Sequence, residues 1–124
     1  MMGRYRLFKQ VDGIPYFADV EVEVLWVTSS LPTVDLYMTS PAPPMEWLVA
    51  AERGARDAVM ALALGIPRDG RCVRVNITRV TTTWTDTTED AIYAASYLAV
   101  VDAVGAQARF ELYRDTAWGV RPRS

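Results

Sequence analysis

The sequence contains no histidine, a single cysteine (Cys72) and a single lysine (Lys9) among 124 residues. Without histidine, neither an ordinary catalytic triad nor a histidine-based metal site can be built. One cysteine cannot close an internal disulfide, and Cys72 stands at the start of an alternating apolar run, which is typical of a small buried thiol in a reducing compartment. We therefore expect no metal, no cofactor and no cysteine- or histidine-based catalysis.

Long apolar runs and an excess of basic residues are missing as well. No run approaches the roughly 18 apolar residues that span a bilayer, and the opening MMGRYRL lacks the apolar core of a signal peptide. The net charge is −2, and only the two chain ends are locally basic. Because proteins that grip nucleic acid through phosphates usually carry a basic excess, the charge counts against an autonomous nucleic-acid binder. We expect a cytoplasmic protein without a membrane partner.

What the chain does contain is the composition of one packed domain. Hydrophobic residues make up 51% and charged residues 23% of a length that is common for single domains. No internal repeat or low-complexity linker divides the chain. We therefore expect a single domain over residues 1–124.

Alternation of apolar and polar residues predicts the strands. The clearest case is Val20 to Val24, where valines alternate with Glu21 and Glu23, so that the valines face a core and the glutamates face water. With the preceding stretch it forms a predicted hairpin whose tip lies at residues 11–16 and contains Asp12 and Gly13, which tolerate positive φ. Strands are predicted over residues 5–10, 20–24, 34–38, 73–84 and 108–113.

Two helices are predicted between these strands. Proline is tolerated in a first helical turn, so Pro44 suits the start of a helix over residues 45–64, whose apolar stripe contains small residues that would let it pack close to a sheet. Asp86 can cap a second helix, with Glu89 as its reciprocal partner in a capping box, and Gly105 suits the end of that helix.

The order βββαβαβ and the polar outward positions of the best strands place both helices on one apolar sheet face. The predicted fold class is α+β: a two-layer α/β sandwich with a mixed sheet of four to five strands and two helices on one face. The other sheet face is left polar and partly exposed, a surface on which a homodimer is expected.

Short stretches at residues 6–10, 16–24, 51–58, 73–77 and 86–91 resemble, in this order, domain IV of translation elongation factor G and of the related ribosomal protection proteins. Residues 6–10 and 16–24 resemble that family's opening hairpin, and residues 51–58, AERGARDA, resemble its first helix. Residues 73–77 and 86–91 resemble its fourth strand and its Asp-Ser-Ser-Glu helix start. The chain is thus similar to a free-standing domain IV over nearly its whole length.

The resemblance implies a left-handed crossover, an exception to the usual rule, and two tip loops that contact RNA in the decoding site. The positions that match these tips are Asp12, Gly13, Tyr16, Thr83, Trp84, Thr85 and Asp86. The first tip lacks the family's glycine-rich, arginine-containing run and the second lacks its histidine. The GTPase domain and every phosphate-binding loop are missing too.

Three functional hypotheses follow. The first is a non-enzymatic interaction domain that docks through its tips on the ribosome, on RNA or on a protein. The second is a small-molecule-binding or accessory protein with a pocket lined by Trp26, Trp47, Met60 and Phe110, or one at a dimer interface. The third is an enzyme using Asp86 and Glu89. The threonine-rich loop around Trp84 has two interpretations. It could bind an anion, a nucleotide base or a partner's loop, or it could be the end of a strand with Trp84 packed over the core.

Overall fold

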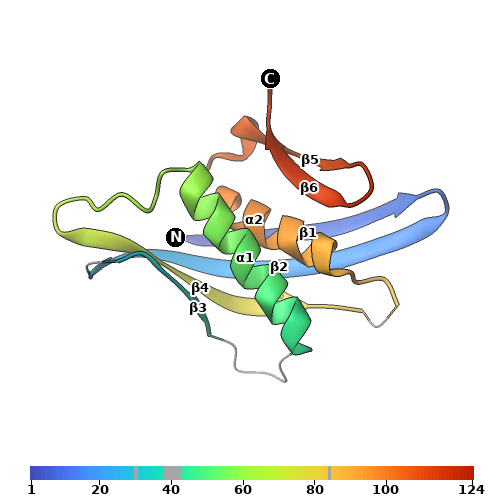
Figure 1. Ribbon diagram of the computed structural model, residues 1–124, viewed down its shortest axis with the longest axis horizontal. Helices are drawn as coiled ribbons and strands as arrows, with labels where there is room; N and C mark the ends of the chain where they lie inside the picture. Colours follow the sequence, from blue (N-terminus) through green and yellow to red (C-terminus); the bar gives the residue numbers. More distant parts are fainter. Residues whose placement is uncertain (30, 38–42, 84) are drawn as a thin grey trace.

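The computed structural model describes residues 1–29, 31–37, 43–83 and 85–124 and has two layers (Figure 1). One layer is a four-stranded sheet, and the other consists of two helices that cover one of its faces. The strands are β1 (Met2–Val11), β2 (Ile14–Thr28), β3 (Thr33–Leu36) and β4 (Arg71–Thr81). The helices are α1 (Met45–Ala61) and α2 (Glu89–Ala103). The predicted α+β sandwich is confirmed.

The sheet has the strand order β1-β2-β4-β3. The β1–β2 and β2–β4 pairs are antiparallel, whereas β3 and β4 are parallel. Parallel neighbours need a crossover connection, and α1 provides it. Viewed from the helix side, the chain passes from β3 through α1 to β4 in the left-handed sense that the resemblance implied (Figure 1).

The alternation in β2 has the predicted consequence. Val20, Val22 and Val24 are buried against the helices, while Glu21 and Glu23 lie on the opposite face. A bulge between Glu21 and Val22 shifts the β2–β4 register without moving the valines out of the core.

Charged side chains on the outer sheet face are largely paired with one another. Arg4 contacts Asp19 at 2.6 Å, Arg74 contacts Asp35 at 3.1 Å and Asn76 donates to Glu23 at 3.3 Å. A homodimer through this face stays a prediction.

Small residues on α1 bring it close to α2 rather than to the sheet, which corrects the expectation from the sequence. A Cβ built on Gly54 would lie 2.3 Å from the carbonyl oxygen of Tyr93, so the two helix backbones nearly touch there. The buried Ser96 hydroxyl donates to the carbonyl of Ala51 at 2.6 Å across the same interface. The sheet is instead covered mainly by α2, whose residues from Ala91 to Val101 are almost all buried, as expected for a helix with partners all round.

The C-terminal region differs from the prediction. The last predicted strand exists as β5 (Phe110–Arg114), preceded by a 3₁₀ turn at Gln107–Arg109, but it does not join the main sheet. It pairs with β6 (Trp118–Pro122), a strand that the sequence pattern did not indicate, and this hairpin packs on α2. Its five-residue strands are too short to form a stable unit alone, so docking on α2 must hold them.

The start of α2 is also corrected. The helix begins at Glu89, and its N-cap is Thr88, whose hydroxyl accepts from the amide of Ala91 at 3.3 Å. The capping box expected from Asp86 and Glu89 is therefore wrong. Asp86 precedes the N-cap residue. Thr87, which lies between Asp86 and Thr88, holds the loop against β2 through its hydrogen bond to the Phe17 carbonyl.

Candidate functional site at the tips of the sheet

The first predicted tip is the turn that joins β1 to β2. Asp12 and Gly13 have φ values of 51° and 78°, the conformation of a two-residue hairpin turn that these residue types favour. The β1–β2 ladder continues to the Val11–Ile14 pair, whereas β4 stops beside Asp19. The hairpin therefore projects beyond the rest of the sheet (Figure 1).

Apolar side chains are exposed along this projecting hairpin. Phe8 is 66% and Ile14 is 55% exposed, and Lys9 is exposed as well. The guanidinium of Arg6 lies 5.7 Å from the ring centre of Phe8 and 5.4 Å from that of Phe17. Large exposed apolar groups beside cations are the composition of a contact surface.

Tyr16 is not at the exposed end of this tip. Its ring packs edge-on against Trp118, with ring centres 5.6 Å apart, and the guanidinium of Arg114 lies 4.5 Å from the centre of the Tyr16 ring. Arg114 also donates to the Tyr16 hydroxyl at 2.9 Å. Tyr16 thus anchors the C-terminal hairpin to β2, and its expected role in binding stays a prediction.

Asp90 completes this anchor. Its carboxylate accepts from the backbone amide of Trp118 at 2.7 Å and lies 3.8 Å from Arg114. Local sequence patterns could not have revealed the cluster, because Tyr16, Asp90 and Trp118 come from three distant segments. Within the described part of the chain, the buried indole nitrogen of Trp118 has no hydrogen-bond partner.

The second predicted tip is fastened to the first. The hydroxyl of Thr87 accepts from the Thr83 amide at 2.8 Å and donates to the carbonyl of Phe17 at 2.9 Å. The Phe17 amide in turn donates to the carbonyl of Asp86 at 2.9 Å. The loop that follows β4 is therefore held against the start of β2, and both tips lie at the same end of the sheet (Figure 1).

The predicted residues of this second tip have different environments. Thr85 is exposed and donates to the carboxylate of Asp86 at 3.0 Å. Among the described residues the hydroxyl of Thr83 is buried without a partner. Trp84 lies outside the residues that the structure describes.

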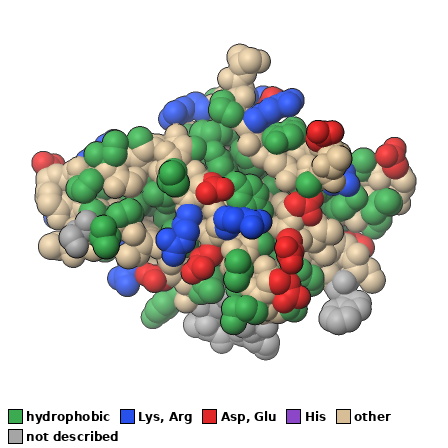
Figure 2. Space-filling view, in the orientation of Figure 1, with side chains coloured by type: hydrophobic (Ala, Val, Ile, Leu, Met, Phe, Trp, Pro, Cys, Tyr) green, Lys and Arg blue, Asp and Glu red, His purple; other side chains and the backbone are tan. Residues whose placement is uncertain are grey.

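The two tips differ in charge. Asp86 and Glu89 make the second tip acidic, whereas Arg6 and Lys9 outnumber Asp12 on the first. Favourable contacts to a phosphate backbone would therefore come from the projecting hairpin. Over the helix-bearing face, acidic and basic side chains are interspersed and no large patch of one sign is visible among the described residues (Figure 2).

The tips contain no arrangement that points to catalysis or metal binding. In the described ranges, no group of three or more His, Cys, Asp or Glu side chains could hold a metal ion. The strongest pKa shift lies elsewhere, on Tyr93, where burial and a 2.5 Å hydrogen bond to Asp57 raise the pKa of the phenol. No helix among the described residues is long and apolar enough to cross a membrane.

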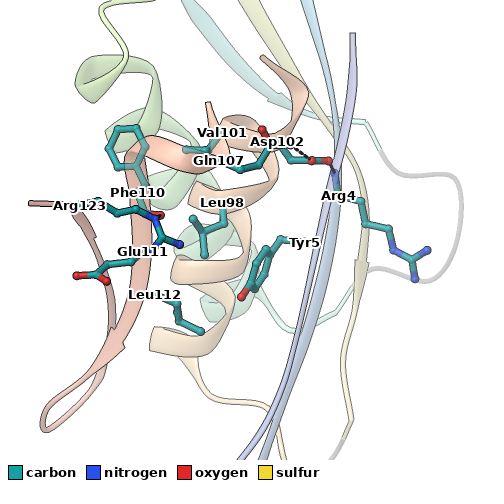
Figure 3. Close-up of a pocket in the computed structure, with 10 residues that line it drawn as sticks. All are labelled: Arg4, Tyr5, Leu98, Val101, Asp102, Gln107, Phe110, Glu111, Leu112 and Arg123. Carbon is teal, nitrogen blue, oxygen red and sulfur yellow. Dashed lines mark hydrogen bonds between the residues drawn. The ribbon is translucent and has the colours of Figure 1, made fainter. Parts of the chain in front are cut away.

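The residues proposed for a small-molecule cavity do not line one common space. Trp26, Met60 and Phe110 border three separate hollows, and Trp47 is half-buried against the core. The hollow at Phe110 lies between α2, β1 and β5 (Figure 3) and has a volume of about 180 Å³, below the usual range for small-molecule sites. Asp102 fills its rim, accepting from the Arg4 amide at 3.0 Å and from Gln107 at 2.6 Å.

The arrangement belongs to the class of two-layer α+β sandwiches with both helices on one sheet face. No protein-family model and no curated protein matches the sequence. Among solved structures, the chain is similar to a protein from Thermus thermophilus, with a TM-score of 0.66 and 16% identity over 96% of this chain. The chain corresponds to 22% of that longer protein. At this identity the likeness shows the fold alone.

Proposed function

We propose that this chain is a non-enzymatic docking domain that binds a macromolecular partner through the projecting β1–β2 hairpin, with the loop after β4 as its support. The observation that carries the proposal is the extension of the β1–β2 ladder past the end of β4 to the Asp12-Gly13 turn. A hairpin that leaves the body of a domain buries little of its own surface. Such a hairpin is suited to contact a second macromolecule.

The ribosome is the partner that we propose to test first. The resemblance of residues 6–10, 16–24, 73–77 and 86–91 to elongation factor G domain IV supports it, because that family uses the loops between such segments in the decoding site, although the tip sequences themselves differ here. Arg6 and Lys9 supply the cations that ribosomal RNA requires, and Phe8 and Ile14 supply apolar contact. Translocation is not part of the proposal, which concerns residues 1–124 alone.

Co-sedimentation with purified ribosomes tests this function. A Lys9→Gln, Ile14→Ser double variant changes two exposed tip residues, and we expect it to reduce the bound fraction about tenfold, with residual binding that falls as salt rises. Met60→Ser is the matched control because Met60 is 78% exposed on α1, away from the tips. Equal binding by the double variant and by Met60→Ser would contradict docking through the hairpin. If the chain captured a protein but no ribosome, the partner would be a protein instead.

A single small-molecule cavity shared by Trp26, Trp47, Met60 and Phe110 gains no comparable support. Its four expected lining residues are distributed over separate hollows and the core.

A further inference from the structure

A second candidate site lies at the opposite end of the sheet from the tips (Figure 1). There the chain enters β4 through a two-residue turn in which Asp69 and Gly70 have φ values of 50° and 74°. The turn is closed by two reciprocal backbone hydrogen bonds of 2.9 Å between Arg68 and Arg71. Residues paired directly across antiparallel strands project to the same side, so this turn presents two arginine side chains together.

Trp26 of β2 completes the site. The guanidinium of Arg68 lies 5.6 Å from the centre of the Trp26 ring. Trp26, Arg68, Asp69 and Arg71 line an open pocket of about 540 Å³. Trp26 is half-buried against the core, which holds its ring in place at the base of the pocket. Both arginines are exposed.

The pocket carries positive charge that no ion pair neutralises among the described residues, a property that it shares with Arg6, Arg53 and Arg56 elsewhere on the surface. Five other arginines are within ion-pair distance of a carboxylate, which leaves little free positive charge around them. Within the described residues neither Arg68 nor Arg71 forms an ion pair. Asp69 is the single acidic residue in the pocket lining, so the site has a local excess of positive charge on a protein whose net charge is −2.

From this geometry we propose that the Trp26–Arg68–Arg71 pocket binds a nucleotide unit, either a free nucleotide or the phosphorylated end of an RNA strand. Two arginines that line the same pocket can both donate hydrogen bonds to one phosphate. Nucleobases stack on aromatic rings and on guanidinium planes, and the Arg68–Trp26 pair offers both. The phosphate lies between the arginines, and the base stacks on the Arg68–Trp26 pair. This site is independent of tip docking.

Asp69 allows a test in which the affinity is expected to rise rather than fall. Its carboxylate repels a bound phosphate, so Asp69→Asn strengthens binding whereas Arg68→Gln and Arg71→Gln weaken it. Asparagine tolerates the positive φ at this position, so the turn is retained. Arg56→Gln is the control because Arg56 is an exposed arginine of α1 outside this pocket.

The experiment is an NMR titration of the intact chain that follows the backbone amides of residues 68–71. The free probes are ADP, adenosine and inorganic pyrophosphate, and the RNA probes are a short single strand with and without a 5′-phosphate. We expect ADP to bind about tenfold more tightly than adenosine or pyrophosphate, because only ADP offers both a base and phosphates. Each Arg→Gln change should weaken ADP about tenfold, and Arg56→Gln should have no effect.

Tighter binding of the phosphorylated strand than of ADP assigns the site to RNA ends, and the reverse assigns it to free nucleotides. The proposal is overturned if ADP at about 10 mM shifts none of these amides, or if the arginine variants bind it as the wild type does. Equal affinity for ADP and pyrophosphate would also overturn it, because the base would then contribute nothing. Loss of tip docking would leave all of these outcomes unchanged.

Discussion

At the residue scale, Gly54 controls how closely the two helices approach. A methyl group at this position would lie 2.3 Å from the Tyr93 carbonyl oxygen and 3.2 Å from the Ser96 side chain. Because Tyr93 presents backbone there, the helices must separate to admit it. We expect Gly54→Ala to lower the free energy of unfolding by about 1–3 kcal/mol, measured by urea denaturation.

Gly65 is the matched control for that substitution. Its φ is not in the left-handed region, and an added Cβ would meet only ordinary contacts at 3.8 Å or more. We expect Gly65→Ala to change stability by no more than about 0.5 kcal/mol or to raise it slightly. Similar denaturation midpoints for the two variants would show that the helices do not approach as closely as described.

The Tyr93–Asp57 pair, also a residue-scale feature, makes stability sensitive to alkaline pH. Burial, followed by the hydrogen bond to Asp57, raises the pKa of Tyr93 above its usual value of 10.0. The folded state then holds this proton more tightly than the unfolded state does. The stabilisation is fully present below about pH 10 and is lost as pH rises through the folded-state pKa.

Tyr93→Phe should therefore reduce stability at neutral pH by about 1–2 kcal/mol and flatten the loss of stability above about pH 10. Urea denaturation over a pH series, together with phenolate absorbance, checks both effects. Tyr37→Phe provides the control because Tyr37 is 69% exposed. If Tyr93→Phe lost stability above about pH 10 as steeply as the wild type does, the pH dependence would come from Tyr5 and Tyr97 instead. Burial raises the pKa values of these two tyrosines as well.

At the element scale, one hydroxyl fastens the loop after β4 to the start of β2. Thr87 is buried and bonds to both the Thr83 amide and the Phe17 carbonyl. Thr87→Val keeps the shape but leaves the Thr83 amide and the Phe17 carbonyl without this partner. We expect a loss of about 1–3 kcal/mol and faster hydrogen exchange at the Thr83 amide.

Thr85→Val is the parallel substitution in the same loop, at an exposed hydroxyl that contacts the neighbouring Asp86 carboxylate. It should leave both stability and exchange nearly unchanged. If Thr87→Val and Thr85→Val had equal effects, the loop would not be held through Thr87.

The sequence predicts elements where local patterns determine them. Val20 to Val24 reveals its buried face by alternation alone, and Asp12-Gly13 reveals a turn because both residues tolerate positive φ. The cap at Thr88 was missed because three neighbouring residues, Asp86, Thr87 and Thr88, could each cap a helix. Tertiary hydrogen bonds to Phe17 decide which of them does.

At the scale of the whole molecule, the layers were predictable and the C-terminal hairpin was not. Tyr16 and Trp118 lie far apart in the chain but their rings meet, and Asp90 holds Trp118 through its backbone amide. No local pattern contains such contacts. The hairpin turn at Asp12-Gly13 was predictable from the sequence, but the side chains exposed beside it were not, because Tyr16 packs against Trp118 and Arg114 while Phe8 and Ile14 are exposed. The binding role of both tips stays a prediction.

The single cysteine makes the central claim open to a direct measurement. Cys72 is 1% exposed, so a cysteine introduced at Ile14 or Met60 can be labelled selectively with a short photo-crosslinker. Both positions are exposed, but only Ile14 lies on the projecting hairpin. After irradiation with ribosomes, Ile14→Cys should crosslink efficiently and Met60→Cys should not. Equal crosslinking at both positions, or crosslinking at Met60 alone, would contradict docking through the tip.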